Sequence, residues 1–398
     1  MENYWTTVIL VFLLAAIPAS FQYYSDVVAA YNRIAIDCGA TKITWDNITT
    51  YAWETDDRYI QSGENKLVSI STTRDEMKTL RSFPSGLKNC YNLPLKTLSK
   101  YLLRAGFLYG NYDNLQKPPA FGLEVQGNSM NVTVATSLSN DTIYHEFIFT
   151  TRKKGNVDVC LVQTQVNQVP FISSLEAKAI DLENSYRFMT ENVALYLQSR
   201  INYGANSSVP ERFAYYVDPY FRVWKPELVP RYRNIDNGFG PITWEWTEIE
   251  NDPPNVVLDS AIVATNASDS ESIFLPINFR EKYRVTACFI LYFDVSPVQQ
   301  FVEETSKLDI FIDGQLLNTT QIPRVNRRVV VSMCPVNITG GTANLTISSA
   351  DNATSPPFLN AIEVYSVIGV SKAAPSSTSL SVLGTFFGLL MCSLHVFL

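Results

Sequence analysis

The sequence predicts an all-β protein that contains two copies of one domain, because the same strand pattern occurs twice. Apolar side chains occupy every second position at 101–109 and again at 283–291. This alternation is typical of a strand with one face on a core. A second alternating stretch follows each of these, at 121–125 and at 308–312. We therefore expect two all-β units of similar construction.

The spacing between motifs is also repeated, which favours duplication over coincidence. A Gly follows the second stretch in each copy, and a Pro-Phe pair comes 43 residues later, at Pro170 and at Pro357. In both copies a glutamate follows that Phe by five residues, at Glu176 and Glu363. Internal repeats of this kind define the architecture before any single motif does.

Composition narrows the function classes. The chain has 398 residues, 46% of them hydrophobic and 17% charged, which suits two or three folded domains. The net charge of −7 argues against a nucleic-acid partner, since phosphate binding needs clustered Lys and Arg. Only His145 and His395 are present, so we expect no His-rich metal site, no cofactor and no His-dependent catalysis.

The N-terminal residues 1–20 have the pattern of a secretory signal peptide. Residues 8–16 form a short apolar run, and Pro18, Ala19 and Ser20 supply small residues before a cleavage site. The run is shorter than the roughly 20 apolar residues that a membrane span needs. The alternative is a buried N-terminal strand or helix.

Secretion agrees with the density of N-glycosylation sequons. Each is a weak signal alone, but nine in one chain favour an extracellular glycoprotein whose sequons face solvent. The expected sites are Asn47, Asn131, Asn140, Asn206, Asn266, Asn318, Asn337, Asn344 and Asn352.

The expected extracellular location permits disulfides. The predicted mature chain keeps five cysteines, so at least one stays outside an internal pair. Cys288 could pair with Cys334, whereas Cys38, Cys90 and Cys160 offer three possible bridges.

Glycine pairs and turn residues suggest two hairpins. Gly155-Asn156 predicts a turn between strands at 143–150 and 157–163. Gly340-Gly341 predicts another between strands at 329–333 and 343–347.

Several motifs in order resemble the malectin-like ectodomain of plant leucine-rich-repeat receptor-like kinases. They cover most of residues 31–368 and read Ile36-Asp37-Cys38-Gly39, Leu80-Arg81-Ser82-Phe83-Pro84, Asn89-Cys90-Tyr91, the stretches 101–112 and 159–176, Asp218-Pro219-Tyr220 and Arg222-Val223-Trp224. The resemblance implies two tandem malectin-like β-sandwich domains of jelly-roll type, side by side. We expect them at 31–200 and 201–369.

The C-terminal residues 370–398 change in composition. Small residues precede a Ser/Thr-rich spacer at 375–381, and residues 382–398 are apolar and uncharged. This order favours a GPI-anchor signal and a location on the outer face of the plasma membrane. The alternatives are a single-pass membrane segment or a truncated form of a receptor kinase.

The resemblance also implies candidate ligand-binding residues on loops at one end of each sandwich. Sugars stack on aromatic rings and take directed hydrogen bonds from polar side chains. The candidates are Asp56, Asp57, Tyr59, Tyr109, Asn111 and Tyr112 in the first domain, and Tyr292, Phe293 and Asp294 in the second. The alternative is that Tyr109 and Phe293 belong to the core and that the polar residues cap turns.

Three functions follow from these expectations. The first is a non-catalytic surface glycoprotein that binds a cell-wall carbohydrate or a secreted peptide, as a receptor-like protein or as a co-receptor of a receptor kinase. The second is a scaffold that pairs with full-length receptor kinases. The third and most remote is a carbohydrate-active enzyme that uses Glu245 and Glu248 beside two Trp residues.

Overall fold

A computed structural model of the chain describes most residues between 33 and 369. The described residues are 33–46, 51–70, 72, 74–126, 130–152, 156–181, 183–207, 211–214, 217–238, 249–264, 272–281, 284–302, 305–323, 328–350 and 355–369. The predicted signal peptide and C-terminal tail, Asn47, Asn266, Asn352, Glu245 and Glu248 lie outside them.

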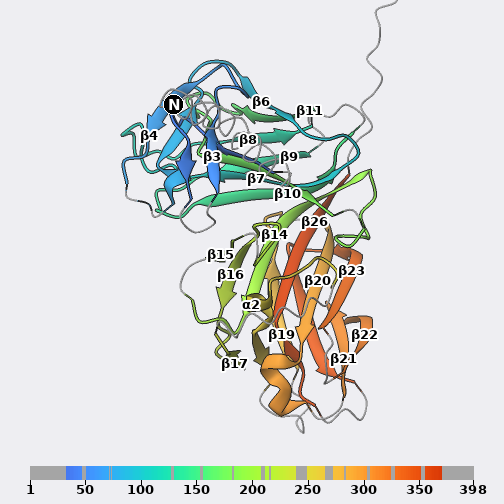
Figure 1. Cartoon of the computed structure of the whole chain (residues 1–398). Helices are drawn as coiled ribbons and strands as arrows, with labels where there is room; N and C mark the ends of the chain where they lie inside the picture. The colour runs from blue at the N-terminus through green and yellow to red at the C-terminus, as the bar shows by residue number, and fades with distance from the viewer. Residues whose placement is uncertain are drawn as a thin grey trace, which may run out of the picture.

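The described chain is built almost wholly of strands in two stacked modules (Figure 1). The first module contains β1 (Arg33–Asp37), β2 (Thr44–Trp45), β3 (Ala52–Thr55), β4 (Glu64–Leu67), η1 (Asp75–Met77), β5 (Thr79–Ser82), β6 (Lys88–Pro94), β7 (Lys100–Phe107), β8 (Ala120–Val125), β9 (Met130–Ala135), β10 (Ile143–Thr150), β11 (Asn156–Val162), β12 (Phe171–Ile172) and β13 (Ser174–Ile180).

The second module has the same kind of construction, with its strands running roughly crosswise to those of the first (Figure 1). It contains β14 (Val193–Tyr203), β15 (Glu211–Arg212), β16 (Val223–Glu227), β17 (Arg233–Asp236), α2 (Asn255–Leu258), β18 (Ser260–Val263), β19 (Ile273–Asn278), β20 (Val285–Asp294), η2 (Ser296–Phe301), β21 (Thr305–Ile312), β22 (Gln315–Pro323), β23 (Arg328–Ile338), β24 (Thr342–Ser349), β25 (Phe358–Leu359) and β26 (Ala361–Gly369).

The two modules match strand by strand, which confirms the predicted duplication. Each has an outer four-stranded sheet, in the order β6-β11-β8-β9 in the first and β19-β24-β21-β22 in the second. Each has a small sheet, β12-β5-β4 and β25-β18-β17, and an inner sheet, β1-β13-β7-β10 and β14-β26-β20-β23. The repeated stretches at 101–109 and 283–291 coincide largely with β7 and β20, which occupy equivalent places.

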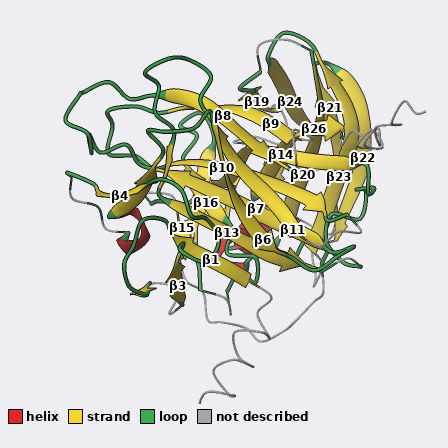
Figure 2. Cartoon of the chain, turned by 90° about the horizontal axis from the view of Figure 1, so that it is seen from above, coloured by secondary structure: helices red, strands yellow, loops and turns green. Residues whose placement is uncertain are grey.

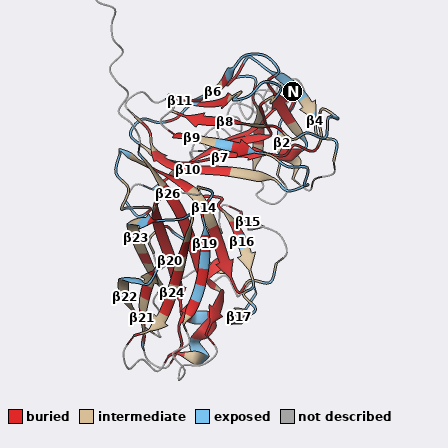
Figure 3. Ribbon diagram, turned by 180° about the vertical axis from the view of Figure 1, so that it is seen from behind, coloured by how far each residue is buried: buried red, intermediate tan, exposed pale blue. Residues whose placement is uncertain are grey.

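The cores explain why these strands form. Leu103, Ala105 and Phe107 of β7 face the core of the first module, as the alternation predicts. Leu102, on the opposite face, is also buried, in a third cluster that includes Tyr292 and Tyr365 of the second module. The inner sheet is therefore covered on both faces, and its strands are largely buried on both sides (Figure 3).

Two equivalent glycines fix the turns after β1 and β14. Gly39 and Gly204 have φ values of +77° and +81°, in the region that glycine occupies without strain. A Cβ on Gly39 would lie 2.2 Å from the carbonyl oxygen of Leu80, and one on Gly204 would lie 2.3 Å from that of Ala261. Each glycine therefore lets β5 or β18 approach the inner sheet.

Both predicted hairpins are wrong. Strand β10 pairs with β7 and β14, whereas β11 pairs with β6 and β8. Likewise β23 pairs with β20, whereas β24 pairs with β19 and β21. In each case the chain crosses from one sheet of the sandwich to the other, because each strand completes its hydrogen bonds with strands that are distant in sequence.

The inner sheets of the modules join into one twelve-stranded sheet. The junction consists of β10 and β14, where Phe147 lies opposite Tyr196 and Ile148 opposite Leu195. Strand β14 runs through residue 200, which sequence reasoning took as the domain boundary, and it pairs along its length with β26. This pairing favours a boundary before residue 193.

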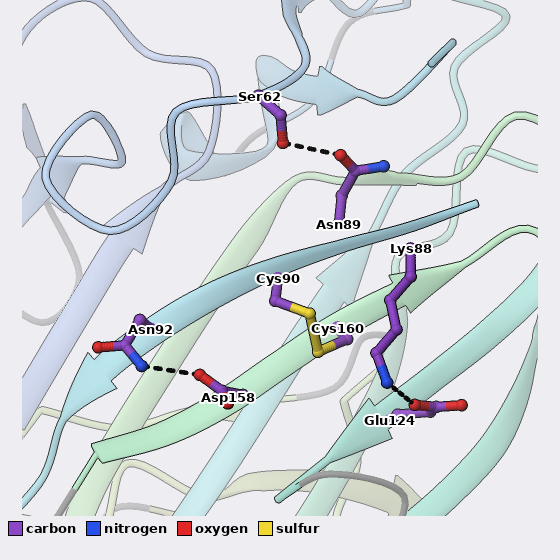
Figure 4. Close-up of a disulfide and its surroundings, with 8 residues drawn as sticks. All are labelled: Ser62, Lys88, Asn89, Cys90, Asn92, Glu124, Asp158 and Cys160. Carbon is purple, nitrogen blue, oxygen red and sulfur yellow. Dashed lines mark hydrogen bonds and ion pairs between the residues drawn. A yellow bond between two sulfur atoms is a disulfide. The ribbon is translucent and has the colours of Figure 1, made fainter. Parts of the chain in front are cut away.

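Two disulfides each connect two neighbouring strands of one sheet. Cys90 of β6 is bonded to Cys160 of β11 (Figure 4), and the pairing considered for Cys288 and Cys334 is confirmed. Cys38 is buried and is the one cysteine outside a disulfide among the described residues.

Candidate functional site

The loops at one end of the first module are held together by the strand register. The end of β7 lies beside the start of β10, the end of β11 beside the start of β6, and the start of β8 beside the end of β9. We call this the loop end; it comprises residues 68–70, 84–87, 108–119, 136–142 and 163–170. Figure 2 shows long loops on this side of the molecule.

Backbone and side-chain hydrogen bonds connect these loops. The Ser69 amide donates to the Gly110 carbonyl at 3.2 Å, and the Gln163 amide donates to the Leu87 carbonyl at 2.9 Å. The Ala120 amide donates to Oε1 of Gln168 at 2.6 Å. The loop end is therefore a connected surface and not a set of independent loops.

Asp56 is a structural residue in this fold. Its carboxylate is fully buried and accepts hydrogen bonds from the Arg81 guanidinium, from the Tyr91 hydroxyl at 2.9 Å and from the Gly39 amide at 3.0 Å. A carboxylate with that many donors joins three segments of the fold and has no free face for a ligand.

The neighbours of Asp56 differ in exposure. The Asp57 side chain is 72% exposed and contacts Arg81 at 3.1 Å. Tyr59 is 5% exposed, and its hydroxyl donates to Glu54. Of the three candidates in this loop, only Asp57 reaches solvent.

Tyr109 belongs to the core, as the alternative interpretation stated. Its ring packs on Phe171, and its hydroxyl donates to Asp113 at 2.5 Å. Burial and that carboxylate raise the pKa of Tyr109 to about 12, so the phenol is neutral. Asn111 accepts from the Gln116 amide at 2.8 Å and shapes the same turn.

Tyr112 lies at the rim of this core. Its ring packs on Phe171 at 5.5 Å between centroids, and its side chain is half-buried, as is that of Asn111. Burial raises the pKa of Tyr112. A half-exposed ring beside an amide is the kind of pair that contacts a ligand.

The second-module candidates lie inside the protein. Tyr292 and Phe293 are fully buried; Tyr292 packs on Trp224 and Phe293 on Phe358. The Asp294 carboxylate accepts from Arg328 at 2.7 Å. Strand β20 is two residues longer than β7, so these positions continue the strand where the first module begins its loop.

Of the nine candidates, the structure brings three to the surface: Asp57, Asn111 and Tyr112. Their role in ligand binding stays a prediction. The other six pack in cores or hold turns. The aromatic ones continue the burial of the strand that precedes them, and the two aspartates are held by arginines.

Sequence reasoning missed four exposed apolar side chains at the loop end. They are Leu87, Leu115, Leu138 and Val166, at 74%, 64%, 56% and 86% exposure. Each comes from a different loop, and all four lie at the same end of one module. Grouped exposed apolar residues often mark a binding surface. Their sequence signal is an isolated apolar residue among Gly, Asn, Gln and Ser.

The junction between the modules contains a buried ion-pair network that sequence reasoning also missed. Glu146 of β10 accepts from Arg104 of β7 at 2.7 Å and from Arg200 of β14 at 2.6 Å. The side chains of all three are 1–2% exposed. Glu146 thus links a cation of each module.

The two repeated glutamates extend this network. Glu176 pairs with Arg33, Arg104 and Arg212. Glu363 pairs with Arg200 and Arg222. The network could have been suspected from charged residues inside otherwise apolar strands.

Two carboxylates of the network, Glu146 and Glu176, have lowered pKa values. Burial alone would raise the pKa of Glu176, but the guanidiniums of Arg212, Arg104 and Arg33 lower it to about 2. The pKa of Glu146 is likewise lowered by Arg200 and Arg104 against the effect of burial. Glu146 and Glu176 therefore remain charged at neutral pH.

The part of the chain that the structure describes contains no group of His, Cys, Asp and Glu side chains arranged to hold a metal ion. Nor does any helix within that part have the length and apolarity to cross a membrane.

Comparison with known proteins agrees with this architecture. The family model for the malectin-like domain matches residues 36–367. The chain is 29% identical over 388 residues to the receptor-like protein kinase At3g46340 of Arabidopsis thaliana, covering 92% of this chain and 41% of that protein. It is 30% identical over 357 residues to the LRR receptor-like serine/threonine-protein kinase At1g51860 of the same plant, covering 87% of this chain and 38% of that protein. The chain thus spans about two fifths of the length of these relatives.

Solved structures share the fold. The ANXUR1 extracellular domain from Arabidopsis thaliana superposes with a TM-score of 0.67 at 13% identity, covering 84% of this chain and 96% of that chain. A crystal structure of the plant peptide RALF23 in complex with FER and LLG2 gives a TM-score of 0.64 at 14% identity, covering 84% and 95%.

Proposed function

Because this chain belongs to the malectin-like domain family, we propose that it is a non-catalytic, extracellular, receptor-like ectodomain that binds a secreted peptide through the loop end. The observation that carries the proposal is the group of exposed apolar side chains from four loops, Leu87, Leu115, Leu138 and Val166. Such side chains supply contact area to a peptide, and the half-buried Tyr112 and Asn111 add a ring and an amide.

The rigid junction supports the same function. Buried ion pairs fix the two modules relative to each other, so the loop end is presented in one orientation. A binding surface that is already ordered loses less conformational entropy when its ligand binds. FER in the complex with the RALF23 peptide and LLG2 has the same fold, which supports a peptide ligand and a second protein partner for this chain.

We further propose that the chain is exported, glycosylated and held at the outer face of the plasma membrane through residues 370–398. There it would act with a receptor kinase or another membrane co-receptor. Among the described sequons, four asparagines are exposed and two are half-buried: Asn131, Asn140, Asn206 and Asn337, and Asn318 and Asn344. None of the six is fully buried, and glycan attachment needs access to solvent. Release of the displayed protein by a phosphatidylinositol-specific phospholipase would test the anchor.

A binding assay tests the ligand proposal. The secreted protein is titrated with RALF23 peptide, with and without LLG2, and the titration is repeated with the double variant Leu115→Ser/Val166→Ser. We expect the variant to weaken binding at least tenfold. Leu98→Ser is the matched control, because Leu98 is 51% exposed in the loop between β6 and β7 at the opposite end of the module. Equal loss in the control, or no binding of peptides by the native protein, would contradict the proposal.

A carbohydrate ligand is the second candidate, favoured by the Tyr112 ring beside Asn111. Titration with cell-wall oligosaccharides separates the two candidates. A Tyr112→Ala change is expected to abolish sugar binding and to weaken peptide binding less than the double variant does.

A further inference from the structure

The outer sheet of the second module carries apolar residues on its solvent face. Its inward residues, such as Leu275, Ile310 and Leu345, form the core. On the outward face, Phe274 lies opposite Thr346, Thr346 opposite Phe311, and Phe311 opposite Leu316. We call these four residues, which cross all four strands in one line, the aromatic row.

The aromatic row is open to solvent. Phe274 is 45% exposed and Leu316 is 50% exposed, and Phe311 and Thr346 are half-buried. Outward positions on such sheets are normally polar. Neighbouring outward residues here are indeed polar, as with Asp309, Thr342 and Ser348. Two outward phenylalanines across a central strand therefore call for a covering group.

A glycosylation sequon lies on the same face, directly beside the row. Asn344 and Thr346 are the first and third residues of Asn344-Leu345-Thr346, and alternation along β24 places both outward. Because Thr346 faces both phenylalanines, Asn344 is the diagonal neighbour of Phe274 and of Phe311. Diagonal neighbours have Cβ atoms about 7–8 Å apart or somewhat less, within reach of long side chains.

The Asn344 side chain is already directed by a hydrogen bond. Its Nδ2 donates to Oδ1 of Asp313 at 3.2 Å, and its backbone amide donates to the same oxygen at 2.8 Å. Glycosylation replaces one hydrogen of Nδ2 and leaves the other. The bond to Asp313 can therefore persist and orient the sugar that is attached.

We propose that an N-linked glycan on Asn344 covers the aromatic row, with its first N-acetylglucosamine packed on the rings of Phe274 and Phe311. The proposal rests on the extracellular location given under the proposed function. In the attachment step Nδ2 of Asn344 forms a bond to the anomeric carbon of an oligosaccharide linked to a polyprenyl diphosphate. The bond from that carbon to the diphosphate breaks, the lipid diphosphate leaves, and the amide loses one proton.

The chemistry of the first sugar fits this surface. A pyranose presents C–H groups on one face, and these pack on aromatic rings, while its hydroxyls and acetamide remain in water. The group that covers the aromatic row is thus a glycan attached to this chain. A second copy of the chain or another protein on the row would be excluded by a glycan in that place.

The equivalent sheet of the first module offers a matched control. Its exposed sequon residue Asn131 lies opposite Glu124, and Glu124 lies opposite Cys160. The outward face around them carries the Cys90–Cys160 disulfide and the Lys88–Glu124 ion pair, with no aromatic residue in that line (Figure 4). A glycan on Asn131 therefore has no ring to cover.

The experiment compares thermal stability after removal of each glycan. The full chain is secreted from a glycosylating host, site occupancy is measured by mass spectrometry of glycopeptides, and Tm is measured for Asn344→Gln and Asn131→Gln. We expect Asn344→Gln to lower Tm by about 2–4 °C, the shift that corresponds to one lost favourable contact in a domain of this size. Asn131→Gln should change Tm by less than about 1 °C on the same scale.

Two further measurements tie the effect to the rings. In a Phe274→Ser/Phe311→Ser background, Asn344→Gln should leave Tm unchanged. Trimming the native protein with an endoglycosidase that leaves one N-acetylglucosamine should keep most of the stabilisation.

Three outcomes would overturn the proposal: an empty Asn344 when other sequons are occupied, equal Tm losses for both Asn→Gln variants, or an unchanged Asn344→Gln effect in the ring-less background. A glycosylated protein that dimerises through the row, detected by light scattering and abolished by Leu316→Ser, would also overturn it. Vacancy at every sequon would instead count against the extracellular location itself.

Discussion

The two outer sheets have the same strand order but different solvent faces. In the sheet β6-β11-β8-β9 the outward positions hold a disulfide, the Lys88–Glu124 ion pair and a hydrogen bond from Asn92 to Asp158. In the sheet β19-β24-β21-β22 the corresponding face holds the aromatic row and a sequon. The duplicated modules therefore share what the core requires and differ where only solvent or a partner is in contact.

The inner sheets show the opposite behaviour at one position, since each carries a buried glutamate there. Glu176 on β13 and Glu363 on β26 occupy equivalent positions and both pair with buried arginines. The two modules therefore agree in the position of a buried glutamate at the junction and differ in the chemistry of their outer faces.

The largest expected effects test this matching of the inner sheets. Glu176→Gln and Glu363→Gln each remove one buried carboxylate from the guanidiniums that it contacts. We expect each to lower the free energy of unfolding by about 3–5 kcal/mol, with Glu176→Gln the larger because three arginines contact it. Urea unfolding measures both. A loss below about 1 kcal/mol in either variant, the value of an exposed pair, would show that the network is not the element that joins the modules.

The next largest effect separates the outer sheets. Replacing Cys90 and Cys160 together by Ala removes a cross-link between residues 70 apart in sequence. We expect a loss of about 2–4 kcal/mol in the free energy of unfolding. The matched pair is Cys288→Ala/Cys334→Ala in the inner sheet of the second module. Differential scanning calorimetry measures both variants. If the Cys90→Ala/Cys160→Ala change leaves the stability unaltered, the disulfide does not stabilise the sheet β6-β11-β8-β9.

A smaller effect concerns His145, which only the first module contains. Its Nδ1 lies 2.7 Å from the Tyr196 hydroxyl. Burial, with the nearby charge of Arg280, lowers the pKa of His145 from 6.5 to about 3. Between these pH values the unfolded chain binds a proton that the folded chain does not, so the free energy of unfolding falls as the pH decreases.

A pH series with His145→Gln isolates this contribution. Burial raises the pKa of Asp37 and of Asp259 to about 6, which has the opposite sign but is the same in both proteins. The variant should therefore show a shallower loss of stability between pH 6.5 and 4 than the native protein. Identical slopes would mean that His145 titrates normally in the folded state.

The smallest expected effect is at the ion pair between the partly exposed Lys88 and Glu124. The Lys88 side chain is 40% exposed, so Lys88→Met should change the free energy of unfolding by less than about 1 kcal/mol. Chemical denaturation with Glu124→Gln as companion checks this. A larger loss would mean that the polar outer face contributes to stability as much as the core does.

The fold was predictable from the sequence because burial imposes a period of two on strands such as β7 and β20, and the repeat preserves it. The hairpins at Gly155 and Gly340 were not predictable, since turn residues do not tell which sheet the next strand joins. Tyr292 and Phe293 lie in the core because β20 continues past the position at which the equivalent strand β7 ends in the first module. That length is set by pairing with β23, which lies some 40 residues later.

The sequence indicates which candidates lie on loops, but it does not indicate the exposed apolar residues beside them. Tyr112 and Asn111 lie on the loop end as expected, but Leu115 and Val166 carry no periodic signal. Arg104 and Glu146 stand out only when their strands are known to be buried on both faces.

The joining of β10 to β14 has a consequence for any attempt to divide the protein. Only two residue pairs connect these strands, yet each strand lies at the border of its own module's inner sheet. A chain cut near residue 190 would leave hydrogen-bonding groups of both strands without partners and expose the charges of Glu146 and Arg200. Free edges of that kind invite aggregation, so neither half is expected to survive as an independent folding unit.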